Sequence, residues 1–124
     1  MTQYKILVVD DNADIRELLE ILLTSEGYAV TLASSGEQAL QLLSPELDLV
    51  ILDIMMPGIS GIRVCEAIRK QRNVPVLFLT AKGQDEDISL GLRVGADDYL
   101  PKPFSHAQLT ARVKSLLRRY RVYQ

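Results

Sequence analysis

The sequence predicts an α/β protein with an open, mostly parallel sheet covered by helices on both faces. Two observations predict this class. Short strand-like segments alternate with stretches whose apolar residues have helical spacing, and this alternation occurs five times. Several strand-like segments, such as Ile6–Val9, are apolar throughout, which is typical of parallel strands buried on both faces. Right-handed crossovers place helices on both sides of such a sheet, but spacing alone leaves the strand order open.

Capping and turn residues define the first two strand–helix units. Asn12 is a suitable N-cap for the first helix, and Gly27 is a suitable stop at its end. Ser35 and Gln38 form a capping-box pattern that opens the second helix. The expected elements are a strand over 6–9, a helix over 12–27, a less buried strand over 28–33 and a helix over 35–43.

The remaining elements follow from the same signals. Pro45 ends the second helix, and Ser60 caps the third. Gly91 lies inside the fourth helix, which we therefore expect to be the weakest, and Gly95 stops it. The expected elements are strands over 47–52, 76–79 and 96–100 and helices over 60–70, 84–94 and 107–120.

Length, composition and charge limit the function. The chain has 124 residues, of which 48% are hydrophobic and 24% charged, so we expect one domain over 1–120 and the start of a linker at 121–124. No apolar stretch approaches the roughly 18 residues of a spanning helix, and no signal-peptide pattern is present. We expect a cytoplasmic protein with no membrane partner. A net charge of -2 disfavours direct binding of nucleic acid.

Polar residues stand where the apolar strands end. Asp10 and Asp11 follow the first, and Asp53, Thr80 and Lys102 follow later ones. Each taken alone could be a helix cap, a turn former or a solvated charge. Parallel sheets, however, bind ligands beyond the carboxyl ends of their strands. The sequence therefore predicts that three carboxylates, a hydroxyl and an amine meet in one crevice.

These groups suit phosphoryl transfer. Three neighbouring carboxylates need raised pKa values or a cation, and an all-oxygen cluster suits Mg²⁺. The Lys and Thr are usual partners of phosphate oxygens. Asp53 is our expected nucleophile because it stands alone before the turn Met55–Gly58, whereas the adjacent acids suit metal binding. Ala81 is small and lets a phosphate approach the backbone.

Five motifs follow one another along the chain: Val8-Val9-Asp10-Asp11, Asp53-Ile54-Met55-Met56-Pro57-Gly58, Thr80-Ala81, Gly95-Ala96-Asp97-Asp98-Tyr99 and Lys102-Pro103-Phe104. With these motifs the chain resembles, over its whole length, the receiver domain of two-component response regulators. The resemblance implies a flavodoxin-like (CheY-like) fold, with a doubly wound five-stranded parallel sheet of order 2-1-3-4-5 and five helices.

The resemblance also implies the roles of the acids. Asp53 would accept a phosphoryl group from a sensor histidine kinase. Mg²⁺ would be held by Asp11, Asp53 and the backbone carbonyl of Met55, with Asp10 as a close outer ligand. The domain would then catalyse nothing beyond its own phosphorylation and dephosphorylation, and Mg²⁺ would be its cofactor.

A switch is implied as well. Lys102 would bind the phosphoryl oxygens, and Thr80 would move to hydrogen-bond the new phosphate while Tyr99 turns inward. The space that the hydroxyl vacates can take an aromatic ring. In this family the Lys102-Pro103 peptide bond is typically cis.

Within the family the chain looks most like the OmpR/PhoB type, whose second domain is a winged helix that binds DNA. We expect a truncated transcription factor that reaches DNA only through a domain absent from this chain. Members form homodimers on phosphorylation through the fourth helix, fifth strand and fifth helix. Charged positions of that face are matched by Asp97, Asp98, Arg112 and Arg119, whereas Ile88 and Gln108 depart from the usual basic residue and Glu.

Rival interpretations keep the same strand-end residues. A stand-alone receiver that binds a partner protein is one. A phosphatase of the haloacid-dehalogenase type would need an acid two residues after Asp53, where Met55 stands. A flavodoxin would need a Ser/Thr/Gly-rich phosphate loop after the first strand. Cys65 falls on an apolar helix face, which indicates an inert core thiol.

Overall fold

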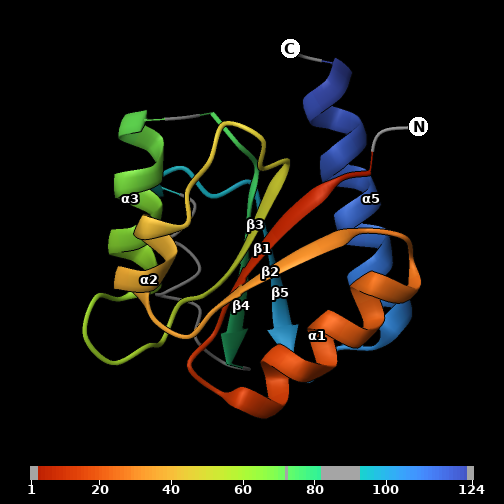
Figure 1. Ribbon diagram of the computed structural model, residues 1–124, viewed down its shortest axis with the longest axis horizontal. Coiled ribbons are helices and arrows are strands. Elements are labelled where there is room, and N and C mark those ends of the chain that lie inside the picture. Colours follow the sequence, from red (N-terminus) through yellow and green to blue (C-terminus); the bar gives the residue numbers. More distant parts are fainter. Residues whose placement is uncertain (1–2, 72, 82–92, 123–124) are drawn as a thin grey trace.

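The computed structural model describes residues 3–71, 73–81 and 93–122, and contains one five-stranded sheet in the order β2-β1-β3-β4-β5 (Figure 1). Every neighbouring pair is parallel, so the predicted fold and strand order are confirmed. The strands are β1 (Lys5–Val9), β2 (Ala29–Ala33), β3 (Leu49–Asp53), β4 (Val76–Ala81) and β5 (Asp98–Lys102). The helices are α1 (Ala13–Ser25), α2 (Gly36–Gln41), α3 (Gly61–Gln71) and α5 (His106–Val122). The fourth predicted helix, over 84–94, falls largely outside the described residues.

Helices α1 and α5 lie on one face of the sheet, and α2 and α3 lie on the other (Figure 1). The strands supply buried residues to both faces in alternation. In β3, for example, Ile51 joins the core beneath α1 and α5, and Leu52 joins the core beneath α2 and α3. A strand with a core on each side has no polar face, which explains the continuous apolar runs in the sequence. No described helix is long and apolar enough to cross a membrane.

Side chains cap the helix starts as the sequence indicates, with one difference. Asn12 accepts hydrogen bonds from the backbone of Asp14 and Ile15. Ser35 accepts from the Gln38 backbone, but the Gln38 amide oxygen reaches back to the N–H of Ser34, not of Ser35. A second capping box, in which Ser105 and Gln108 exchange hydrogen bonds, starts α5 and was not predicted.

Several element boundaries differ from those predicted. Strand β3 begins at Leu49, not at residue 47, and α2 ends at Gln41, two residues before the expected end. Strand β5 runs over 98–102 where 96–100 was expected, because pairing continues through Pro101, which is opposite Thr80. A proline without an N–H is tolerated there since β5 is an edge strand. Helix α5 continues to Val122, two residues into the segment expected to begin a linker.

Two loop features adjoin the carboxyl edge of the sheet. The Lys102-Pro103 peptide bond is cis, as the family resemblance implies. At the start of α3, Gly61 packs directly on the end of β3, and its N–H donates to the Ile54 carbonyl at 2.9 Å. A Cβ on Gly61 would lie 2.2 Å from the backbone oxygen of Asp53, closer than any real contact. The position therefore needs glycine for space.

We predict that Gly61→Ala destabilises the fold by about 3 kcal/mol, because backbone must move to admit the methyl group. Gly27→Ala is the matched control: Gly27 has a φ of +91° but open space around it, so only the cost of the left-handed backbone, about 1 kcal/mol, applies. Urea unfolding of both variants measures the difference. Equal losses would show that the contact with Asp53 is relieved at little cost.

Candidate functional site

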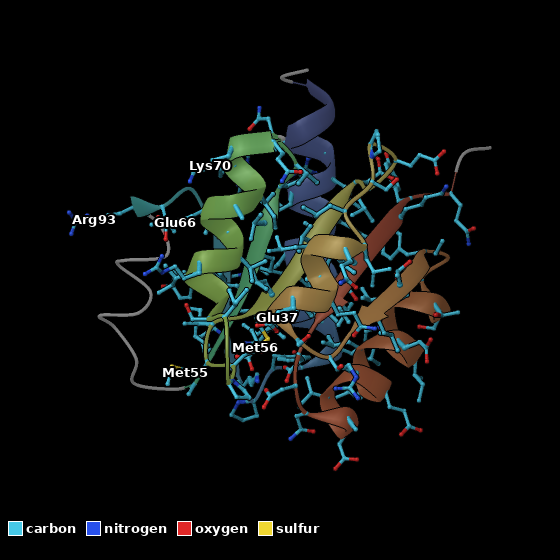
Figure 2. All side chains as sticks on the ribbon, turned by 60° about the vertical axis from the view of Figure 1, so that its left-hand side comes forward. Glu37, Met55, Met56, Glu66, Lys70 and Arg93 are labelled. Atoms are coloured by element: carbon cyan, nitrogen blue, oxygen red, sulfur yellow. The ribbon has the colours of Figure 1, made fainter. Side chains whose placement is uncertain are left out.

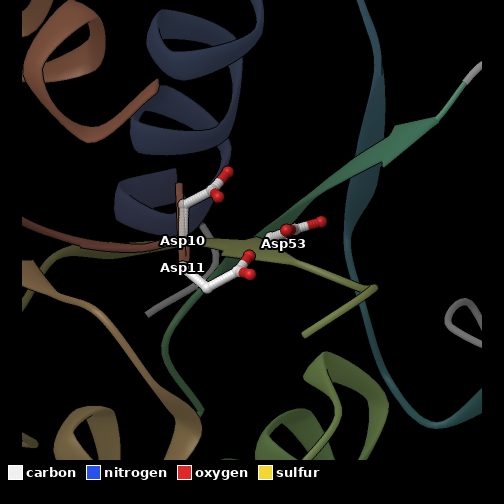
Figure 3. A group of neighbouring side chains, drawn as sticks. All are labelled: Asp10, Asp11 and Asp53. Atoms are coloured by element: carbon white, nitrogen blue, oxygen red, sulfur yellow. The ribbon is translucent and has the colours of Figure 1, made fainter. Parts of the chain in front are cut away.

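Three carboxylates meet at the carboxyl edge of the sheet. Asp10 and Asp11 follow β1, and Asp53 is the last residue of β3, the strand beside it (Figure 3). One oxygen of each carboxylate lies within 4.8 Å of the others. Val9 and Leu52 are opposite each other in the register of β1 and β3. The residues that follow them, Asp10 and Asp53, therefore lie close together.

Asp10 is the most buried of the three, with no exposed surface. Its Oδ1 accepts a hydrogen bond from the Asn12 N–H at 2.9 Å, and its Oδ2 lies 3.1 Å from Lys102 Nζ. The Arg16 guanidinium also donates to the Asp10 backbone carbonyl at 2.8 Å. Arg16 was not predicted as a site residue. Its position in the first turn of α1, directly after the strand end, could have indicated a contact with Asp10. Asp11, in contrast, is exposed, so its carboxylate is accessible to a metal ion from solvent.

Asp53 is 5% exposed, and both of its carboxylate oxygens have favourable contacts. Its Oδ1 accepts from the Met55 N–H at 3.2 Å, and its Oδ2 lies 3.6 Å from Lys102 Nζ. Burial, and then the charge of Asp10, raises the pKa of Asp53 from 3.8 to about 6, against the opposing effect of Lys102. The domain therefore holds this carboxylate at an electrostatic cost that a bound cation would relieve.

Thr80 and Ala81 form the end of β4 next to Asp53. The Thr80 side chain is 1% exposed, and its hydroxyl has no hydrogen-bond partner within the described part of the chain. Buried hydroxyls normally have a partner, so this one is available to a group that enters the site. Ala81 is exposed and is opposite Lys102 in the sheet register. The structure thus brings the predicted hydroxyl, small residue and amine to the same edge.

The donor set fits a hard divalent cation. The acids offer carboxylate oxygens close to one another. Oxygen ligands of this kind, with space left for water, suit Mg²⁺. Among the described residues, Lys102 is the amine that stands beside the two buried acids, where it can also meet phosphate oxygens.

The aromatic residue of the predicted switch lies on β5. Tyr99 is half-buried against the core beneath α2 and α3. Its carbonyl accepts a hydrogen bond from the Arg112 guanidinium at 2.7 Å, and the guanidinium carbon lies 5.9 Å from the centroid of the tyrosine ring. The same guanidinium pairs with Asp98 at 2.8 Å. Arg112 therefore connects the strand backbone, the ring and an acid of the predicted dimer face.

The other predicted dimer-face residues have varied surroundings. Asp97 pairs with Arg69 of α3 at 2.7 Å, an interaction that the sequence did not suggest. Gln108 helps to cap α5, because its side-chain oxygen accepts a hydrogen bond from the Ser105 N–H. Arg119 is exposed on α5. Ile88 lies outside the described residues.

The parallel sheet of order 2-1-3-4-5 with acids, Thr and Lys at its carboxyl edge defines an α/β signalling domain of the receiver type. The sequence model of the family described as the response regulator receiver domain matches residues 6–114. The chain therefore belongs to the response regulator receiver domain family.

Similar proteins agree with this assignment. The chain is 59% identical over 121 residues to YrkP, an uncharacterized transcriptional regulatory protein of Bacillus subtilis, covering 98% of the chain and 52% of the relative. It is 50% identical over 115 residues to the transcriptional regulatory protein CpxR of Escherichia coli, covering 93% and 50%. The chain thus spans about half the length of these relatives.

Solved structures show the same fold. A response regulator receiver domain protein from Clostridium thermocellum superposes with a TM-score of 0.92 at 30% identity, covering 98% of this chain and 99% of that one. A CheY-like receiver domain protein from Methanospirillum hungatei has a TM-score of 0.92 at 26% identity, covering 99% and 100%. The resemblance stated from the motifs is confirmed at the level of the family and the fold.

We predict that Asp53→Asn stabilises the metal-free domain by about 1 kcal/mol near pH 7.5. Because the pKa of Asp53 is raised from 3.8 to about 6, the folded state holds more protons than the unfolded state between these values. The free energy of unfolding therefore falls as pH rises through this range, and the penalty persists above it. Urea unfolding in EDTA should show a gain at pH 7.5 that shrinks towards pH 4. A gain of the same size at both pH values would contradict the electrostatic cause.

Proposed function

We propose that this domain is the phosphoacceptor of a two-component system and that Asp53 takes the phosphoryl group from a sensor histidine kinase. The observation that carries the proposal is the grouping at one sheet edge of Asp53, Lys102 Nζ at 3.6 Å from it, and the buried hydroxyl of Thr80, which has no partner among the described residues. An amine and an unpaired hydroxyl beside a nucleophilic carboxylate match the needs of a bound phosphate.

The reaction follows from the groups present. Mg²⁺, held by Asp11, Asp53 and the Met55 carbonyl with Asp10 nearby, would neutralise charge on the carboxylates and on the phosphoryl oxygens. A carboxylate oxygen of Asp53 forms a bond to phosphorus as the bond from phosphorus to the histidine nitrogen of the kinase breaks, and that nitrogen keeps the electron pair. Lys102 donates to the phosphoryl oxygens. The domain catalyses only this step and the later hydrolysis.

The new phosphate supplies an acceptor for the unpaired hydroxyl. A phosphoryl group carries nearly two negative charges and strong acceptor oxygens, so Thr80 is drawn towards it. Tyr99, half-buried on the adjacent strand, can then move inward. This movement would alter the surface made by β5 and α5, and it is the event we assign to signalling.

The primary test is the intact mass of the domain after incubation with acetyl phosphate and Mg²⁺. We expect a gain of one phosphoryl group in the unmodified domain and none with EDTA or with Asp53→Asn. Lys102→Ala should slow the gain by at least about tenfold because a charge-assisted contact in the transition state is lost. Steady release of inorganic phosphate without a mass gain would indicate a phosphatase instead. No gain and no release would leave a domain that acts through binding alone.

The wider function rests on the relatives. Because the chain covers about half of regulators such as CpxR, we propose that it acts with a DNA-binding domain and reaches DNA only through it. Phosphorylation would promote homodimerisation through β5, α5 and the predicted fourth helix, which falls largely outside the described residues. The alternative is a receiver that binds a partner protein without a second domain. A cytoplasmic location and the absence of a membrane partner remain parts of this proposal.

We predict that Arg119→Glu weakens the phosphorylated dimer about tenfold or more, because a positive charge that would face an acid of the second copy becomes a like charge. Arg118→Glu is the matched control: Arg118 is also exposed on α5 and adjacent in sequence, but it is not a predicted dimer-face residue. Analytical ultracentrifugation before and after phosphorylation measures both variants. Equal weakening by the two substitutions would place the interface elsewhere.

A further inference from the structure

The loop between β3 and α3 has contacts on both of its sides. It carries Met55, whose carbonyl is a proposed Mg²⁺ ligand. On the inner side, the Met55 N–H donates to Asp53, and the Gly61 N–H donates to the Ile54 carbonyl. These bonds fix the two ends of the loop. They leave the turn between them, Pro57 to Ser60, to be held from elsewhere.

Glu37, in the first turn of α2, contacts that turn from the outer side. The Ile59 N–H donates to Glu37 Oε1 at 3.3 Å. The preceding residue, Gly58, has a φ of +76°, and a Cβ there would lie 3.1 Å from the same carboxylate oxygen. Figure 2 shows Glu37 close to the loop that contains Met55 and Met56. The carboxylate therefore packs against two successive residues of the turn.

The start of α2 is itself fixed against the same loop. A Cβ on Gly36 would lie 2.9 Å from the Ile59 carbonyl oxygen and 2.7 Å from a methyl carbon of Val64, so helix and loop are in direct contact there. The Ser35 cap sets where the helix begins. Glu37 consequently has a defined position from which to hold the Ile59 N–H.

We propose that Glu37 is a positioning residue for the Mg²⁺ site, acting through the backbone of the β3–α3 loop. This inference rests on the proposed function. A ligand supplied by a backbone carbonyl has no side chain with which to adjust, so its place depends on the hydrogen bonds that shape its loop. Glu37 supplies the outer one of these bonds. An acid in the first turn of a helix is otherwise explained by the helix dipole, so sequence alone gives no sign of this role.

The test is calorimetric titration of the domain with Mg²⁺. Glu37→Ala should raise the dissociation constant about three- to tenfold, the range expected for one lost hydrogen bond. Glu37→Gln keeps an oxygen that can accept from Ile59 and should stay within about twofold of the unmodified domain. Glu20→Ala removes an equally exposed acid from α1 and serves as the control for net charge. Thermal unfolding of each variant in EDTA separates loop positioning from general stability.

A Glu37→Ala variant with unchanged Mg²⁺ affinity would overturn the inference, whether or not its melting temperature falls. So would equal weakening by Glu37→Gln, which would show that charge matters and the hydrogen bond does not, or by Glu20→Ala. The mass measurement with acetyl phosphate separates the two levels of the argument. An unmodified domain that neither binds Mg²⁺ nor gains a phosphoryl group refutes the proposed function. If the unmodified domain does both, the Mg²⁺ affinities of the Glu37 variants test the positioning role by itself.

Discussion

The fold has to hold Asp10, Asp11 and Asp53 together although their carboxylates repel one another, and the rest of the structure depends on this constraint. Two like charges about 4 Å apart near a protein surface repel by roughly 4 kcal/mol, and this domain places three carboxylates within 4.8 Å. Rigid strands with a buried core on each face keep them together. Lys102 offsets part of the repulsion, and a cation offsets more. Without a cation, the repulsion lowers the free energy of unfolding. A cation that binds relieves the repulsion and raises the free energy of unfolding, so cation binding and stability are linked.

Much of this arrangement could be predicted from the sequence, because buried parallel strands leave a strong signal. Continuous apolar runs located the strands, and the residues after them located Asp53, Thr80 and Lys102. The strand order came only from the family motifs, since crossover lengths are compatible with several orders. Boundaries were predicted less well: the fifth strand was expected to stop at residue 100, but pairing continues through Pro101, which an edge strand accommodates because one of its sides is unpaired.

Long-range side-chain contacts away from the strand ends could not be predicted. Nothing in the sequence distinguishes Arg69, which pairs with Asp97, from other arginines near helix ends. The hydrogen bond between Glu37 and Ile59 joins residues from separate elements and depends on how α2 packs against the loop. Such contacts exist only after the layers assemble. Arg112 is a further example, because its guanidinium donates both to the Asp98 carboxylate and to the Tyr99 carbonyl.

Arg69 anchors the amino end of β5. Its guanidinium donates to the carbonyls of Val74 and Gly95 and pairs with Asp97, whose carboxylate also accepts from the Val76 N–H. The amino end of β5 is thereby fastened to α3 and to the start of β4. The opposite end of β5 carries Lys102, inside the acid crevice. Any shift of β5 that follows a displacement of Lys102 would therefore be larger at the carboxyl end of the strand, which lies in the acid crevice, than at the amino end held by Arg69.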